Sequence, residues 1–141
     1  MWPDTVEEAD ALSGPRGELA ARTVAMPADT NPSGEIFGGW IMSQMDSAGM
    51  MTATRHAQGR VTTVAVTNMA FHCPVKVGDV VCCYTDLARV GRTSATFHIE
   101  VWVLRGSRGT RCKVTSAEFT FVALDAEGRP RPFVPAAEAT A

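Results

Sequence analysis

One stretch without an obvious polar face constrains the fold of this 141-residue chain more than any other. Residues 37–54 contain no proline, have Gly38-Gly39 near their start and carry a single ionisable side chain, Asp46. Large apolar residues recur there at helical spacing, which predicts a helix. We expect the following residues of that helix to face the core: Phe37, Trp40, Ile41, Met45 and Met51.

The opposite side of this predicted helix is also small or apolar. It carries Gly39, Met42, Ser43, Asp46, Gly49, Met50 and Ala53. A helix without a polar face has to be covered on all sides, so we expect other structure to wrap around it. The isolated carboxylate of Asp46 is a candidate general base. A buried carboxylate that is satisfied by Ser or Thr hydroxyls, with no catalytic role, would give the same pattern.

The rest of the chain has the pattern of β-strands, with Gly59 as a suitable C-terminal cap for the helix. The predicted strands cover residues 18–26, 61–71, 80–90, 94–103 and 110–124. This β-α-β-β-β-β order predicts an α+β fold in which an antiparallel curled sheet wraps around one long central helix. The second apolar side of the helix then needs a second copy of the chain, which predicts a two-fold homodimer as the minimal unit.

Composition narrows the possible functions. The net charge of −2 argues against a nucleic-acid partner. No apolar run is long enough for a membrane span, and the acidic start is unlike a signal peptide, so we expect a cytoplasmic protein without a membrane partner. We expect a disordered N-terminal arm over residues 1–17, one domain over 18–133 and a C-terminal tail over 134–141.

Cysteines and histidines do not form a recognisable metal or disulfide pattern. The cysteines Cys73, Cys82, Cys83 and Cys112 lack C-x-x-C spacing, and we interpret them as reduced core residues. The histidines, at 56, 72 and 98, share no ligand spacing with a cysteine or an acid. The sequence therefore predicts neither a metal ion nor an organic cofactor.

The block MPADTNPSGEIFGGWIMSQMD, residues 26–46, resembles the hotdog-fold acyl-CoA thioesterases, most closely the bacterial YciA type. The resemblance continues through GRVTTVAV (59–66), VGDVVCCY (77–84), VGRTS (90–94), EVWV (100–103) and FTFVALDAEGRPRP (119–132). It implies the hotdog fold, hydrolysis of acyl-CoA to free fatty acid and CoA, and a hexamer made of three dimers.

The resemblance also implies a catalytic site. Asp46 would be the catalytic carboxylate, acting as general base or nucleophile, and Asn31 would position substrate or water. The amides of Gly38 and Gly39 would bind the thioester oxygen, because a helix N-terminus offers unpaired N–H groups aimed at developing negative charge. On the residues alone, the double glycine could be only a tight helix start and Asn31 only an Asx-turn.

Residues for CoA are less well marked. We expect Arg92, Thr93 and Ser94 to contact the substrate, with His72 close to it. Most of the basic residues at turns and strand ends, a set that includes Arg105, have the pattern of solvated charges. One position departs from the family, which often has Lys or Arg immediately before the proline where this chain has Cys73. A basic contact to the CoA phosphates is then missing or supplied elsewhere.

Two other functions fit the same fold. A non-catalytic acyl-CoA-binding or regulatory module would share the topology, although Asp46 and Asn31 argue against it. A hotdog dehydratase or hydratase would need a histidine paired with an acid on the loop and helix. No histidine occurs between Met26 and Arg55.

Overall fold

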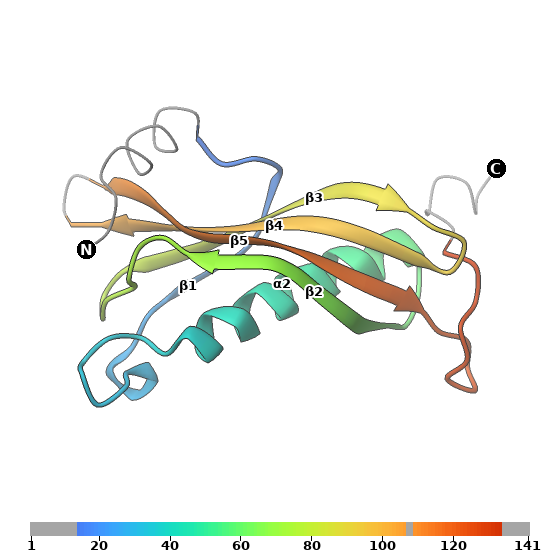
Figure 1. Ribbon diagram of the computed structural model, residues 1–141, viewed down its shortest axis with the longest axis horizontal. Helices are drawn as coiled ribbons and strands as arrows, with labels where there is room; N and C mark the ends of the chain where they lie inside the picture. Colours follow the sequence, from blue (N-terminus) through green and yellow to red (C-terminus); the bar gives the residue numbers. More distant parts are fainter. Residues whose placement is uncertain (1–13, 107–108, 134–141) are drawn as a thin grey trace.

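A computed structural model describes residues 14–106 and 109–133 of the chain. Most of the predicted arm (1–17) and the whole predicted tail (134–141) lie outside the described residues. One sheet curves over one long helix, α2, as Figure 1 shows, which confirms the predicted α+β class. In chain order, the elements are β1 (Glu18–Val24), the 3-10 turn η1 (Pro27–Asp29), α2 (Gly38–Ala57), β2 (Val61–Phe71), β3 (Val80–Val90), β4 (Ser94–Arg105) and β5 (Thr110–Ala123).

The sheet is antiparallel throughout, in the order β1-β3-β4-β5-β2, so β2 lies at one edge. The alternation predicted for β4 is confirmed. Its residues that face the helix are all buried, namely Ala95, Phe97, Ile99, Val101 and Val103. Two register shifts interrupt the pairing of β2 with β5, and Asn68 lies in one of them with a left-handed φ of 59°. Such bulges bend an edge strand, which helps the sheet to curl.

The helix α2 contacts all five strands, and small residues let it lie close to them. A Cβ atom at Gly49 would lie 2.7 Å from Ile99 Cδ1 and 2.7 Å from Phe121 Cζ. The residues of α2 that are buried against the sheet are Ile41, Met45, Ala48, Gly49, Thr52, Ala53 and Ala57. The predicted core side was therefore wrong in part.

Two large residues that were expected in the core are on the surface. Phe37 is 50% exposed and Met51 is 53% exposed, while Trp40 is half-buried. The short distance between helix and sheet explains this error, because it selects Gly and Ala rather than the largest side chains for the contact.

The C-terminal cap of α2 is Gln58, one residue before the predicted cap Gly59. Gln58 takes the left-handed conformation (φ 54°, ψ 45°), and its side chain donates to the Arg55 carbonyl at 3.0 Å. Gly59 instead leaves room for the side chain of Arg131. A Cβ there would lie 2.7 Å from Arg131 Nη2, which donates to the carbonyl of Ala57 at 2.9 Å.

The face of the sheet turned away from α2 contains a buried carboxylate. Trp102 Nε1 donates to Glu100 Oε1 at 2.9 Å, and His98 Nε2 lies 2.8 Å from Glu100 Oε2. Burial alone would raise the pKa of Glu100, but those two contacts, the Arg16 backbone amide and the charge of Lys113 lower it below its ordinary value. The ionised form therefore stabilises the folded chain.

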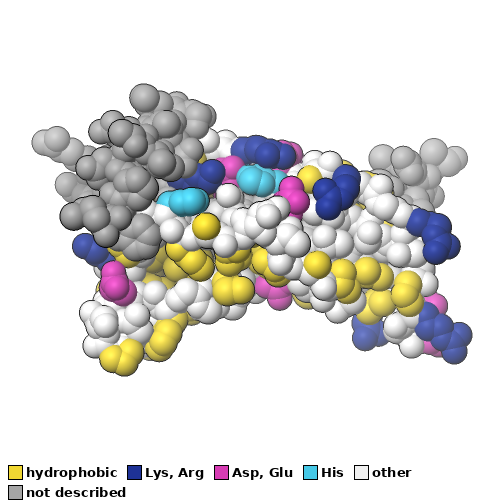
Figure 2. Space-filling view, in the orientation of Figure 1, with side chains coloured by type: hydrophobic (Ala, Val, Ile, Leu, Met, Phe, Trp, Pro, Cys, Tyr) yellow, Lys and Arg dark blue, Asp and Glu magenta, His cyan; other side chains and the backbone are white. Residues whose placement is uncertain are grey.

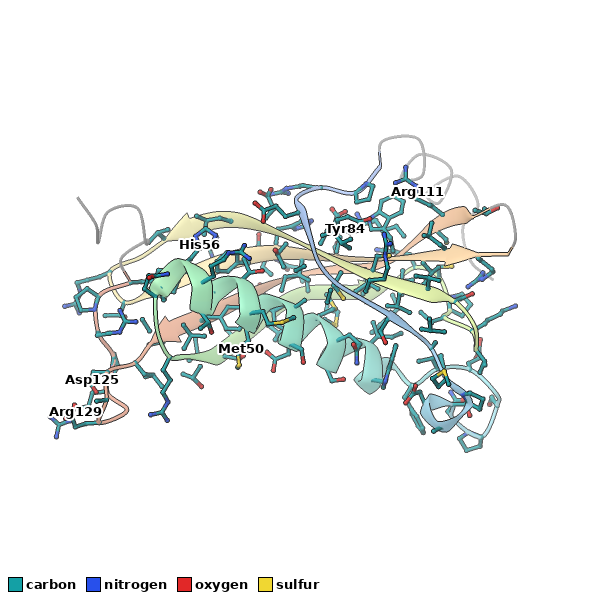
Figure 3. The ribbon with its side chains drawn as sticks, turned by 180° about the vertical axis from the view of Figure 1, so that it is seen from behind. Met50, His56, Tyr84, Arg111, Asp125 and Arg129 are labelled. Atoms are coloured by element: carbon teal, nitrogen blue, oxygen red, sulfur yellow. The ribbon has the colours of Figure 1, made fainter. Side chains whose placement is uncertain are left out.

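Large apolar side chains remain exposed along β2 and the neighbouring surface of α2. Figure 2 shows hydrophobic atoms in a band across the middle of this face. Met50, labelled in Figure 3, lies on the side of α2 turned away from the sheet. The exposed residues are Phe37, Met42, Met50, Met51, Val64, Val66 and Phe71. An apolar band of this kind marks an interaction surface.

The close contact at Gly49 gives a first prediction. Gly49→Ala should lower the free energy of unfolding by about 1–2 kcal/mol, because overpacking outweighs the gain of about 1 kcal/mol in helix propensity. Gly39→Ala is the control, since a Cβ there has nothing within 4 Å. Urea titrations at one protein concentration measure both. Equal stabilisation by both substitutions would contradict the packing described here.

The lowered pKa of Glu100 gives a second prediction. Near neutral pH, Glu100→Gln should reduce the free energy of unfolding by about 1–2 kcal/mol, because hydrogen bonds to an ionised group are lost. The wild-type advantage should be complete above the unfolded-state pKa and should disappear as pH falls through the lower folded-state pKa. Chemical denaturation from pH 7 to pH 3 measures it, with exposed Glu127→Gln as the control. An advantage that grows toward acid pH would refute the assignment.

Candidate functional site

Asp46 lies near the middle of α2, at a groove between this helix and β2. Its carboxylate is half-buried, and Thr63 Oγ1 donates to Asp46 Oδ1 at 2.6 Å. Within the described residues, Thr63 is its only hydrogen-bond partner. The groove has a volume of about 280 Å³ and is lined by Met42, Ser43, Asp46, Thr63, Val66 and Phe119. A carboxylate with one oriented oxygen thus lies beside an apolar surface.

Asn31 and Gly38 line a second, separate pocket of about 160 Å³. Asn31 Oδ1 accepts hydrogen bonds from the backbone amides of Ser33 (2.9 Å) and Glu35 (3.1 Å), so the Asx-turn interpretation is confirmed. Those two donors fix which side-chain atom is oxygen. The NH₂ group of Asn31 has no partner among the described residues, so it can donate to a ligand.

The start of α2 offers two unused backbone donors. The N–H groups of Trp40 and Ile41 both bond to the Phe37 carbonyl, at 3.1 and 3.3 Å. The N–H groups of Gly38 and Gly39 have no such partner in the described chain, and no side chain caps this end of the helix. Both glycines are exposed, so their donors can reach a ligand.

The residues predicted for CoA are divided between two ends of the molecule. Arg92, Thr93 and Ser94 lie beyond the C-terminal end of α2, where the Arg92 carbonyl accepts from the Phe133 amide at 3.0 Å. Figure 3 labels His56, Asp125 and Arg129 at this end. The 20-residue helix is about 30 Å long, so this trio is remote from Gly38 in the same chain.

His72 instead lies near the pocket of Asn31 and Gly38. It follows β2 directly and continues the ladder, since its amide donates to the Val114 carbonyl at 2.7 Å. Its neighbours on both sides, Phe71 and Cys73, line that pocket.

An ion pair that the sequence did not reveal fixes one wall of the same pocket. Arg105 Nη2 donates to Asp79 Oδ2 at 2.7 Å and to the carbonyl of Pro74, a lining residue, at 2.8 Å. Asp79 is 3% exposed, and its Oδ2 also accepts from the Lys76 amide. Hydrogen bonding to Asp79 raises the pKa of Arg105 above its ordinary range. Arg105 is therefore an exception to the expectation that most of these basic residues are solvated charges.

Within residues 14–106 and 109–133, no three His, Cys, Asp or Glu side chains gather as metal ligands would. No helix in the described part of the chain is long and apolar enough to cross a membrane.

The Asp79–Arg105 pair gives a third prediction. Arg105→Met should reduce the free energy of unfolding by about 3–5 kcal/mol, because it leaves the Asp79 charge buried and unpaired. The double variant Asp79→Asn/Arg105→Met should recover much of that loss. Exposed Arg111→Met, which removes only a cation–π contact with Trp102, should cost about 1 kcal/mol or less. Thermal and urea unfolding measure all three, and a similar cost for Arg105 and Arg111 would contradict the assignment.

Comparisons with known proteins identify the family of this chain. The sequence model of the thioesterase superfamily matches residues 33–110. Acyl-CoA thioester hydrolase YciA from Salmonella typhimurium is 54% identical over 121 residues, which cover 84% of this chain and 91% of that protein.

Solved structures of thioesterases are also similar to this chain. A hexameric thioesterase from Yersinia pestis has 55% identity and a TM-score of 0.82, covering 85% of this chain and 98% of its own. An aspartate-to-alanine variant of a hexameric broad-specificity acyl-coenzyme A thioesterase has 53% identity and a TM-score of 0.81, covering 84% of this chain and 87% of its own. The chain therefore belongs to the thioesterase superfamily, among the hotdog-fold acyl-CoA thioester hydrolases.

Proposed function

We propose that this protein hydrolyses acyl-CoA thioesters to a free fatty acid and CoA, with Asp46 as the catalytic carboxylate. The observation that carries the proposal is the placement of Asp46, half-buried in an apolar groove and oriented by Thr63, in a chain 54% identical to acyl-CoA thioester hydrolases. The apolar side chains of the groove, Met42, Val66 and Phe119, suit an acyl chain.

Thioester hydrolysis passes through a tetrahedral intermediate with negative charge on the former carbonyl oxygen. Fixed donors aimed at that charge lower the barrier, and the loss of one donor typically costs about 3 kcal/mol. The unused N–H groups of Gly38 and Gly39 at the positive end of the helix dipole would serve as these donors. The NH₂ group of Asn31, in the pocket that Gly38 also lines, would hold the substrate or the attacking water.

The carboxylate of Asp46 would act in its ionised form. It would either take a proton from an attacking water or attack the thioester carbon itself. In both routes the Thr63 hydroxyl, which binds Oδ1, would keep the carboxylate in one orientation and leave Oδ2 for the reaction.

One chain alone would not bring these groups together. Gly38 and Asp46 are eight residues apart on one helix, which is about 12 Å along its axis. Their two pockets have no lining residue in common. A reacting group has to be about 3 Å from the carbon that it attacks. Asp46 would therefore serve a substrate held by the Asn31 and Gly38 of another copy.

A two-fold dimer through the exposed band of α2 and β2 would meet this requirement. It would cover the apolar side chains there and pair the β2 edges of two chains. Antiparallel α2 helices would then place Asp46 of one chain opposite Gly38 of its partner. The Arg92, Thr93 and Ser94 end of one chain would lie nearer to the helix start of the other, within reach of the CoA phosphates.

The relatives support an assembly larger than a dimer. Both solved thioesterases compared above are hexameric. We expect three such dimers in the hexamer of this protein.

The role of Asp46 gives a fourth prediction. Asp46→Asn keeps the side-chain volume but removes the base or nucleophile, so kcat should fall by about 100-fold or more with little change in KM. The assay is release of the CoA thiol from a panel of short-chain to long-chain acyl-CoA substrates. Asp86→Asn, an exposed acid-to-amide change on β3, is the control and should keep wild-type turnover.

Two results would contradict the proposal. If folded Asp46→Asn kept a tenth or more of wild-type turnover, Asp46 would be a structural carboxylate satisfied by Thr63. If wild-type protein bound acyl-CoA but released no thiol from any substrate of the panel, the chain would be a non-catalytic binding module.

A further inference from the structure

Two cysteines that are 39 residues apart in the sequence meet beside the pocket of Asn31 and Gly38. The sulfur atoms of Cys73 and Cys112 lie 2.7 Å apart, in a thiol–thiol contact. Cys73 follows the end of β2, and Cys112 lies near the start of β5, just beyond the last pair that joins these two strands. A disulfide has an S–S length of about 2.05 Å, so bond formation requires the sulfurs to move by less than about 1 Å.

A guanidinium group lies close to this pair of thiols. Arg105 Nη2 donates to the Pro74 carbonyl, next to Cys73 in the chain. The pKa of Arg105 is raised chiefly by its hydrogen bond with Asp79, and charge on either of the two sulfurs raises it further.

Access differs between the two thiols. Cys73 is 4% exposed and lines the pocket, whereas Cys112 is only half-buried. A reagent from solution would therefore reach Cys112 first. Cys73 would then be in position to attack the modified sulfur.

The other two cysteines provide a contrast within the same chain. Cys82 and Cys83 are adjacent on β3, where successive side chains point to opposite faces of the sheet. Burial, with a smaller effect of Cys82, raises the pKa of Cys83 to about 12. These two residues are suited to packing and not to redox chemistry.

We propose that Cys73 and Cys112 form a reversible disulfide, with low-molecular-weight disulfides as the oxidant. The Cys112 thiolate attacks one sulfur of the oxidant, forms a mixed disulfide and releases one thiolate. The Cys73 thiolate then attacks the Cys112 sulfur, forms the intramolecular S–S bond and releases the second thiolate. The two cysteines lose two electrons, the oxidant gains them, and the two cysteine protons pass through solvent to the released thiolates.

The bond would join a wall of the Asn31 and Gly38 pocket covalently to β5. It replaces a contact that depends on two side chains with a covalent link, and it closes a loop that includes all of β3 and β4. Cross-links over loops of this length stabilise a fold by restricting the unfolded chain. The inference depends on these contacts and not on the proposed hydrolysis.

The test uses the purified full-length protein with oxidised glutathione as the probe. After exposure and alkylation of the remaining thiols, peptide mass spectrometry should find Cys73 linked to Cys112 within one chain, and dithiothreitol should reverse it. The oxidised protein should melt roughly 5–10 °C above the reduced protein. Cys82→Ala is the matched control and should form the same bond.

Two single variants test the order of the steps. Cys73→Ser should keep glutathione on Cys112 as a stable mixed disulfide, because the resolving thiol is absent. Cys112→Ser should leave Cys73 reduced, with glutathione reacting about tenfold or more slowly. Absence of the intramolecular bond in folded wild-type protein, or linkage only between chains, would overturn the proposal. Faster modification of Cys73 than of Cys112 would also overturn it.

Discussion

The close packing of α2 against the sheet is the constraint on which the rest of this structure depends. At Gly49 the backbone of the helix comes so near to Ile99 and Phe121 that no Cβ fits without displacement of these side chains. This contact buries Ile41 and Met45 together with the small residues on one side of the helix. The other methionines of the helix lie on its exposed side. The helix is thus half-covered, and it presents Asp46 at the boundary between the covered and the uncovered side.

Two kinds of interaction then fix the chemical groups around that helix. A hydroxyl from the edge strand β2 orients Asp46, and the buried Asp79–Arg105 pair holds the wall of the pocket at the helix start. Both depend on the sheet, so a loss of sheet packing would disturb the two pockets together. The cysteine pair lies against the second of these walls, beside the same guanidinium.

The sequence was sufficient for the elements but not for every contact between them. Strands 61–71 and 80–90 were predicted to the residue, because alternation and turn residues are local signals. The prediction of the buried side of α2 was partly wrong. It placed Met51 in the core because of its size, whereas the short distance between helix and sheet favours a small residue such as Gly49 at the contact. Arg105 was missed because its partner Asp79 is 26 residues away in the chain, and only the β3–β4 pairing brings them together. The contact of Thr63 with Asp46 was missed as well, because these residues lie on different elements and only the packing of β2 beside α2 brings them together.

A catalytic site that needs groups from two chains can be tested in a mixed assembly. Asp46→Ala and Asn31→Ala chains carry different affinity tags, and each is first shown to be inactive alone. Co-expression followed by purification on both tags then yields assemblies that contain both variants. If two chains share each site, a mixed dimer has one site with both substitutions and one with neither, so thiol release should return to at most half of the wild-type rate. If each chain supplies a complete site, every site keeps one substitution and no activity returns. That result would show that the catalytic site is not shared between two chains.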